Sequence, residues 1–212
     1  MWSIALALFT VLTPVAASAL PDKLPPVDQC SKNPTFAAFR ARLEHAAQSK
    51  DRKAFLELLS RHVLVNFGGA SGPAAFAQSW DLSPDASEFW NLLRTMLRMG
   101  CARDKGARII PSLSIQLEPY FEEEIDLSSK RLAFPGARVS KEPAGDRNAF
   151  ATLSWDFVDA VETSADMQTK VKLADGREGW IADDQLYEPV GYRMVVEKLH
   201  GKWMITAFVA GD

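Results

Sequence analysis

The chain has 212 residues, with 24 Lys and Arg against 27 Asp and Glu, and 47% of its residues are apolar. This composition is typical of a folded globular protein, and the length suits one large domain or two small ones. The net charge of −3 offers no basic surface for nucleic acid, so we expect no nucleic-acid partner.

Residues 1–19 have the pattern of a cleavable signal peptide. They contain no charged side chain, Ile4–Leu12 is almost continuously apolar, and Ala17–Ala19 is a small-x-small cleavage pattern. The apolar run is shorter than the roughly 20 residues that a membrane-spanning helix needs. We therefore expect a periplasmic or secreted protein that begins at Leu20 and has no membrane anchor after cleavage. The alternative is a buried N-terminal helix, which the prolines of residues 20–26 disfavour.

The sequence contains two cysteines, Cys30 and Cys101. In an oxidising compartment two cysteines most simply pair, so we expect a disulfide. Its closed loop of about 70 residues would stabilise the fold by about 4 kcal/mol on the chain-entropy estimate. The alternative is two separate buried thiols. No histidine lies three or four residues from either cysteine, so we expect no metal site.

The N-terminal half predicts mainly helices, after a proline-containing lead-in of residues 20–32. Asn33-Pro34 is typical of a helix N-cap followed by proline in the first turn. Asp51 and Ser87 can cap later helices, and Gly100 is a plausible helix end. The apolar spacing predicts helices over 34–47, 52–59, 72–80 and 88–99, and a strand over 63–67.

From residue 109 onward β-type segments dominate the chain. Residues 133–189 contain five short strands separated by turns, which suits a small closed barrel. Asp175-Gly176 predicts a tight hairpin between two of these strands. The returning strand, Glu178–Ile181, alternates in character, and we expect Trp180 to point inward and fill the barrel interior.

This stretch resembles the bacterial SH3-like (Src-homology-3-like) domain of exported proteins. The resemblance rests on Pro143 after the first strand, on Ala151–Leu153, and above all on Asp175–Ile181 followed by Leu186. Where that family often has an aromatic residue before its third long strand, this chain has Met167-Gln168. The resemblance implies a binding module that recognises a peptide or a cell-wall fragment such as peptidoglycan.

Residues 190–212 predict a closing β-hairpin that turns at His200-Gly201. This ending resembles that of exported bacterial proteins carrying such a barrel. The front of the chain and this hairpin together resemble the cone fold of the nuclear-transport-factor-2-like (NTF2-like) group. That likeness implies that the hairpin completes an α+β domain of residues 20–132, with the barrel inserted into it or appended to it. The expected class is α+β: N-terminal helices, then a β-rich half with a five-stranded SH3-like barrel and the hairpin.

Catalytic motifs are missing from the sequence. In Gly69–Gly72 the serine is followed two residues later by Pro73, where a nucleophile elbow needs glycine. The three histidines are scattered, so their spacing suggests no nucleophile–base set. There is no phosphate-cradling glycine loop and no dinucleotide fingerprint, so we expect no cofactor.

Trp155, Trp180 and Tyr187 are the candidate ligand-binding residues of the barrel. The alternative is that both tryptophans belong to its core, since aromatic rings dominate small cores. The sequence thus favours an exported, non-enzymatic binding protein whose barrel recognises a peptide or cell-wall fragment. The alternative is a small-molecule-binding protein or enzyme with a pocket in a cone-like α+β domain.

Overall fold

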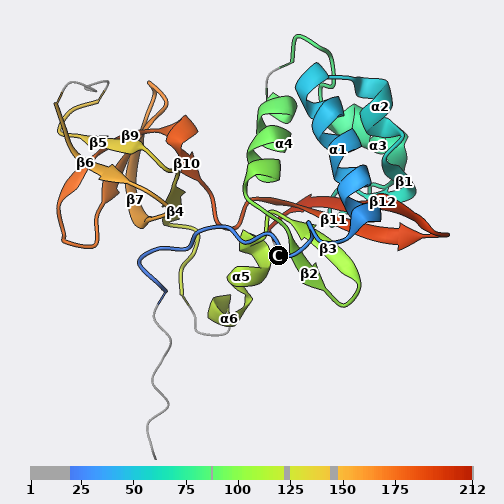
Figure 1. Cartoon of the computed structure of the whole chain (residues 1–212). Helices are drawn as coiled ribbons and strands as arrows, with labels where there is room; N and C mark the ends of the chain where they lie inside the picture. Colours follow the sequence, from blue (N-terminus) through green and yellow to red (C-terminus); the bar gives the residue numbers. More distant parts are fainter. Residues whose placement is uncertain (1–19, 87, 122–124, 144–147, 212) are drawn as a thin grey trace, which may run out of the picture.

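The computed structural model describes residues 20–86, 88–121, 125–143 and 148–211. The expected signal peptide and the expected cap at Ser87 lie outside these residues. The described chain is α+β, as predicted, with helices mainly in its N-terminal half and two β-sheets (Figure 1). Within it, no helix is both long enough and apolar enough to cross a lipid bilayer.

The first sheet has five strands among the described residues, in the order β1-β12-β11-β3-β2. They are Leu59–Leu64 (β1), Ala102–Asp104 (β2), Ala107–Ile110 (β3), Tyr192–Leu199 (β11) and Lys202–Ala210 (β12). β1 runs parallel to β12, and the other neighbours are antiparallel. The C-terminal strands β11 and β12 therefore lie in the middle of a sheet whose other strands come from the front of the chain.

Helices from the N-terminal half cover one face of this sheet (Figure 1). They are Pro34–Ser49 (α1), Arg52–Leu56 (α2), Gly72–Ser79 (α3) and Glu88–Arg98 (α4). The predicted caps at Asn33 and Asp51 are confirmed, since each side chain accepts hydrogen bonds from backbone N–H groups of the first turn. Gly100 follows α4 with a φ of +73°, the left-handed conformation that commonly ends a helix.

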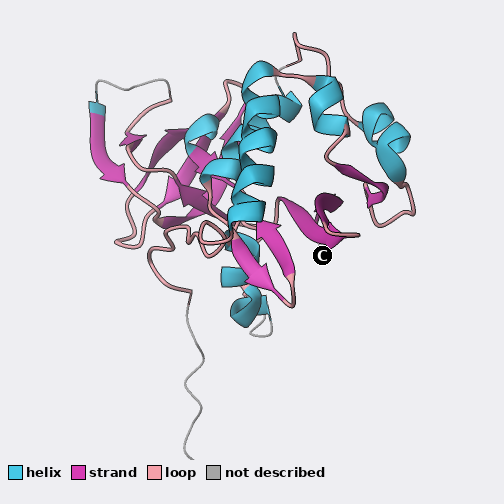
Figure 2. Cartoon of the chain, turned by 45° about the vertical axis from the view of Figure 1, so that its right-hand side comes forward, coloured by secondary structure: helices cyan, strands magenta, loops and turns pink. Residues whose placement is uncertain are grey.

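The second sheet is built from seven strands of the described chain, all antiparallel to their neighbours, in the order β10-β4-β7-β8-β9-β5-β6. They are Lys130–Ala133 (β4), Ala137–Ser140 (β5), Ala149–Leu153 (β6), Phe157–Ser164 (β7), Gln168–Lys172 (β8), Glu178–Ala182 (β9) and Leu186–Tyr187 (β10). A 3-10 turn, Asp183–Gln185 (η2), connects β9 to β10, and two short helices, Leu113–Gln116 (α5) and Glu118–Phe121 (α6), precede β4. Figure 2 shows that the helices gather around the first sheet, whereas the second consists almost entirely of strands and loops.

The prediction that Trp180 points inward and fills the interior of the barrel is wrong. Ile181 is fully buried in the core of the second sheet, while Trp180 lies on the opposite face of β9 and is half-buried. Gly179 shares the buried face, where an added Cβ would lie 2.6 Å from Val139 Cγ1. The alternation along β9 is present, but Gly179 and Ile181 occupy its buried face, and a shift of one residue exchanges the two faces of a strand.

The lead-in segment, residues 20–32, contacts both sheets. At the second sheet, the Leu24 N–H donates to the Trp155 carbonyl and the Phe157 N–H donates to the Asp22 carbonyl, both at 2.9 Å. At the first sheet, the Cys101 N–H donates to the Val27 carbonyl at 2.9 Å. The lead-in therefore spans the junction between the sheets as an extended strap.

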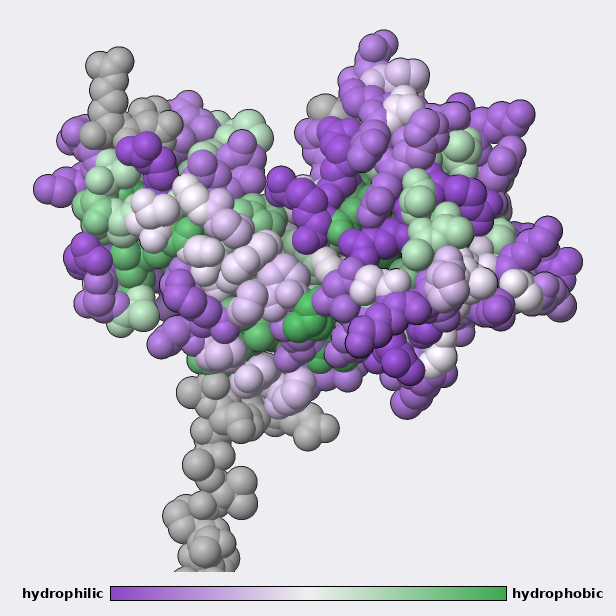
Figure 3. All heavy atoms as spheres, viewed as in Figure 1, coloured by the Kyte–Doolittle hydropathy of each residue, from purple (hydrophilic) through white to green (hydrophobic). Residues whose placement is uncertain are grey.

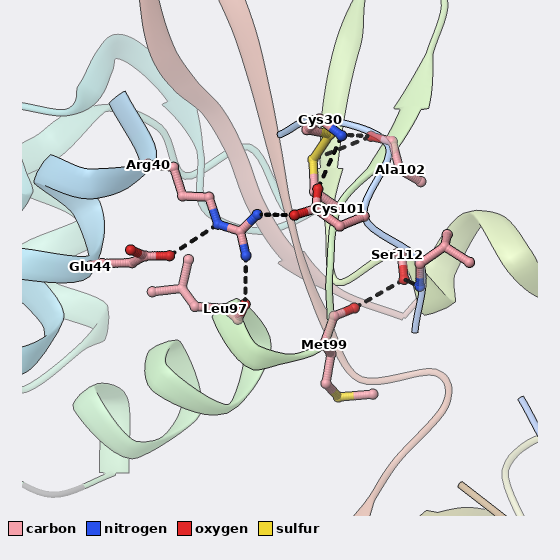
Figure 4. Close-up of polar contacts among 10 residues, drawn as sticks. Cys30, Arg40, Glu44, Leu97, Met99, Cys101, Ala102 and Ser112 are labelled. Carbon is pink, nitrogen blue, oxygen red and sulfur yellow. Dashed lines mark hydrogen bonds and ion pairs between the residues drawn. A yellow bond between two sulfur atoms is a disulfide. The ribbon is translucent and has the colours of Figure 1, made fainter. Parts of the chain in front are cut away.

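The predicted disulfide between Cys30 and Cys101 is confirmed (Figure 4). The Cα atoms of the two cysteines lie 5.8 Å apart, within the usual range for a disulfide. Both residues are buried. The bond fastens the end of the lead-in to the point where α4 has ended and β2 begins.

Polar contacts surround the disulfide (Figure 4). Arg40 of α1 forms ion pairs with Asp28 at 2.6 Å and with Glu44 at 3.0 Å. Its guanidinium also donates to the Leu97 carbonyl in the last turn of α4 at 3.4 Å. The Ser112 hydroxyl accepts from the backbone N–H of Val27 at 3.0 Å and is buried. These contacts hold α1, α4 and the lead-in against one another.

Two substitutions test which residue of β9 belongs to the core. We expect Ile181→Ala to lower the free energy of unfolding by about 2–5 kcal/mol, because it leaves a cavity at a fully buried site. Trp180→Ala is expected to cost less, since its ring is already half in water. Urea unfolding of both variants measures the difference. A larger loss of unfolding free energy for Trp180→Ala than for Ile181→Ala would instead place Trp180 in the core.

Candidate functional site

The space between the helices and the first sheet is packed with aromatic rings. Phe76 lies 5.5 Å from Phe89 and 5.4 Å from Phe208, measured between ring centroids. Phe55 contacts the same group, with its centroid 4.9 Å from that of Phe89. All four rings are fully buried. The two largest cavities described below lie outside this core, so neither occupies the interior that a cone-like pocket would use.

One cavity, of about 630 Å³, lies between α4 and the second sheet, and we call it the α4–β10 cleft. Figure 3 shows the surface hollowed between the two lobes in this region. One wall is the polar face of α4, because Asn91, Arg94 and Arg98 recur three and four residues apart while the opposite face of the helix is buried. The facing wall is formed by Asp184 of η2, by Leu186 and Tyr187 of β10, and by Glu188, which follows β10. Phe134 and Tyr192 also line the cleft.

The two walls of the α4–β10 cleft carry opposite charges. Arg94 and Arg98 lie on the helix wall, and Asp184 and Glu188 lie on the facing wall. The Arg98 guanidinium lies 5.3 Å from the centroid of the Phe134 ring, a distance typical of a cation–π contact. Among the described residues, neither cleft arginine forms an ion pair with a carboxylate. The helix wall thus presents positive charge that a ligand can neutralise.

Tyr187 is buried at the edge of the cleft. Its hydroxyl donates a hydrogen bond to the backbone carbonyl of Tyr192, the first residue of β11, at 3.1 Å. Burial raises the pKa of the Tyr187 hydroxyl above its ordinary value, and the negative charge of Glu188 adds to the shift. The phenol is therefore neutral at physiological pH and links β10 to the first sheet.

The other large cavity, of about 510 Å³, lies on the opposite face of the first sheet, beside α5 and α6. Arg193, Val195 and Glu197 of β11 point into it, whereas Met194 and Val196 point into the aromatic core. Gly191 lines both this cavity and the α4–β10 cleft. The segment that connects β10 to β11 thus separates the two cavities.

The structure places two of the three candidate residues together. Trp155 and Tyr187 both lie near Phe134, with ring centroids 5.8 Å and 6.4 Å from the Phe134 centroid. Tyr187 lines the α4–β10 cleft, and Trp155 packs behind it in the same apolar cluster. Trp180 lies on β9, opposite Lys170 and Ser140 of the neighbouring strands, and does not line the cleft.

Sequence reasoning missed the charged residues of the cleft. Arg94 and Arg98 stand on one helix face, and that spacing is visible in the sequence. Their juxtaposition with Asp184 depends on how the two sheets meet, which no local pattern encodes. The three histidines are all exposed, and the described residues contain no group of three His, Cys, Asp or Glu side chains that could hold a metal ion.

Comparison with known proteins identified no matching family model and no matching curated protein. Similar solved structures include an NTF2-like protein with a cystatin-like fold from Novosphingobium aromaticivorans, at 12% identity and a TM-score of 0.29, covering 84% of this chain and 80% of that one. An NTF2-like protein of unknown function from Shewanella oneidensis has 13% identity and a TM-score of 0.29, covering 84% and 98%.

A third similar structure is a putative calcium/calmodulin-dependent protein kinase II association domain from Xanthomonas campestris. It has 11% identity and a TM-score of 0.29, and the match covers 91% of this chain and 96% of that one. The first two structures are described as NTF2-like, the group that the front and the closing hairpin resemble. TM-scores this low do not establish a shared fold.

The buried hydroxyl of Tyr187 makes stability depend on alkaline pH. Its pKa is raised in the folded state, so the unfolded chain loses this proton first as the pH rises above the ordinary value of 10.0. The contribution is fully present below that pH, and we expect the free energy of unfolding to fall above it. In Tyr187→Phe the fall should be shallower. Urea unfolding at a series of pH values measures both slopes, and equal slopes would contradict the assignment.

Proposed function

We propose that this protein is an exported, non-enzymatic binding protein that holds a short peptide, such as a peptide fragment of the cell wall, in the α4–β10 cleft. One observation carries the proposal: the cleft joins a positive wall, a negative wall and an aromatic surface in one cavity of about 630 Å³. A cavity of this size is typical of sites for small ligands.

A peptide with free ends matches this distribution of charge. Its carboxylate would meet Arg94 and Arg98, which lack carboxylate partners in the described chain. Guanidinium groups bind carboxylates with two parallel hydrogen bonds, which gives orientation as well as affinity. Its amino end would meet Asp184 across the cleft, beside Glu188, which pairs with Arg131 at 3.1 Å. The apolar part of the ligand would lie along Phe134 and Leu186.

The proposal also gives a role to the β-rich residues 133–189, which we propose form a domain inserted between β3 and β11 of the α+β domain. Peptide recognition is the function that the SH3-like resemblance implies for these residues. In the proposal, η2 and β10 supply one wall of the site, and α4 supplies the other. Binding then takes place at the junction of the two sheets rather than on the face of β9 that carries Trp180.

Peptide binding can be tested with a matched pair of ligands and a matched pair of variants. The ligands are the pentapeptide stem of peptidoglycan with a free carboxyl end and the same peptide with an amidated end. We expect amidation to weaken binding to the wild type about tenfold, which is about 1.4 kcal/mol. Arg98→Ala should weaken binding of the free acid and reduce the difference between the two peptides, because one of the two guanidinium groups that face the carboxylate is then lost. Isothermal titration calorimetry measures each affinity.

The control is Arg52→Ala, which removes an exposed arginine of α2 outside the cleft. It should bind both peptides as the wild type does. The proposal fails if the wild type binds neither the pentapeptide nor purified peptidoglycan. It also fails if Arg98→Ala distinguishes the free acid from the amide as strongly as the wild type does.

Export is the second part of the proposal. The Cys30–Cys101 disulfide is compatible with folding in an oxidising compartment. We expect the chain, expressed with its own leader in a bacterium, to be recovered outside the cytoplasm with Leu20 at its N-terminus. N-terminal sequencing of the periplasmic and secreted fractions is the measurement. Recovery of the chain only in the cytoplasm, with Met1 retained, would contradict export.

A further inference from the structure

A third cavity, of about 460 Å³, lies at the N-terminal end of α1. It is lined by two segments that the disulfide brings together. Gln29 and Lys32–Thr35 flank Cys30, and Arg103 and Arg108 follow Cys101. The Arg103 N–H donates to the Gln29 side-chain oxygen at 3.0 Å, which joins the segments directly. We call this the α1 cavity.

The charged residues that line the α1 cavity are all positive. Lys32, Arg103 and Arg108 line it, and no Asp or Glu of the described residues is among its lining residues. Arg103 and Arg108 are direct partners in the antiparallel pairing of β2 with β3, so their side chains leave the sheet on the same face. Two like charges at such a position repel each other, and the chain itself carries a net charge of −3. This local excess of positive charge calls for a compensating anion.

Arg108 is the second observation that points to a ligand. It is 9% exposed, and its guanidinium lies 5.0 Å from the Trp203 ring centroid. Nη1 donates to the carbonyls of Gly106 and Ala107, but the buried Nε has no hydrogen-bond partner. A buried donor without an acceptor is costly, and more so when the group is charged. Burial, with the charge of Arg103 second, lowers the pKa of Arg108, as expected for a cation lacking a counter-charge.

The start of α1 adds to the positive potential. Asn33 caps the helix by accepting from the N–H groups of Thr35 and Phe36 at 3.1 Å, and Pro34 occupies the first turn. The aligned peptide dipoles of a 16-residue helix place partial positive charge at this end. Because Asn33 already accepts from the first-turn N–H groups and Pro34 has none, α1 contributes its dipole to the cavity rather than direct hydrogen bonds.

We propose that the α1 cavity binds the phosphate group of a small phosphorylated compound. A doubly charged phosphate would be neutralised by the guanidinium groups of Arg103 and Arg108 and by the ammonium group of Lys32. Three cations in one cavity match the charge of a phosphate better than that of a single carboxylate. The cavity is larger than a phosphate ion needs, so the rest of the compound has room beside Gln29 and Thr35. This site is independent of the α4–β10 cleft and of the peptide proposed to bind there.

The test uses inorganic phosphate and glycerol 3-phosphate as probes, titrated calorimetrically into the mature protein at an ionic strength fixed with sodium chloride. We expect saturable binding of both probes, with glycerol 3-phosphate binding more tightly. Arg103→Gln should weaken binding of each at least tenfold. Arg103 is exposed, so this variant is expected to fold. Arg61→Gln, which removes an exposed arginine of β1 outside the cavity, should bind as the wild type does.

Arg108→Lys is the second variant, because it keeps the charge but loses the planar fork. It should bind phosphate more weakly than the wild type. Its free energy of unfolding should still fall at alkaline pH as in the wild type, which shows that the contacts of Tyr187 are intact. The proposal is overturned if the wild type shows no saturable heat with either probe. It is equally overturned if Arg103→Gln and Arg61→Gln bind phosphate alike.

Discussion

The Cys30–Cys101 disulfide is the constraint on which the arrangement of this protein depends. It holds the lead-in against the residues where α4 has ended and β2 begins, and the Gln29 N–H continues the contact by donating to the Cys101 carbonyl at 2.8 Å. Gly100 makes the close approach possible, because an added Cβ there would lie 2.2 Å from the Val27 carbonyl oxygen. From this point the lead-in runs to the second sheet, where Lys23 pairs with Asp156 at 2.7 Å. A covalent bond at one end of the strap thus limits how far the two sheets can separate.

Both candidate sites follow from that constraint. The α4–β10 cleft exists because the second sheet is held beside α4, and the apolar cluster shared by Met99, Leu113 and Phe134 fills the junction beneath it. The α1 cavity exists because the disulfide brings Lys32 beside Arg103. The sites differ in chemistry. The cleft offers both signs of charge and aromatic surface, which suits a peptide, whereas the α1 cavity offers positive charge and an unpaired buried donor, which suits a phosphate.

The sequence was sufficient where local chemistry decides the structure. Asn33 and Asp51 carry side chains that cap helices, Asp175-Gly176 turns β8 back into β9, and two cysteines in an otherwise cysteine-free chain form one disulfide. The sequence was not sufficient for Trp180, because the alternation of side chains along a strand does not show which face of the strand is buried. Gly179 was the available signal, since a glycine within a strand often marks close approach of a neighbour. The placement of Arg98 and Asp184 on facing walls of the cleft arises from tertiary structure and could not be predicted.

The most direct test of the central claim is amide hydrogen exchange in the double variant Cys30→Ala/Cys101→Ala, compared with the oxidised wild type. The account predicts that the amides of Val27, Gln29 and position 101 lose protection, because the strap then detaches locally from the first sheet. The amides of β7, β8 and β9, which are paired within the second sheet, should keep theirs. Unchanged protection along the lead-in would contradict the claim that the disulfide holds the strap in place.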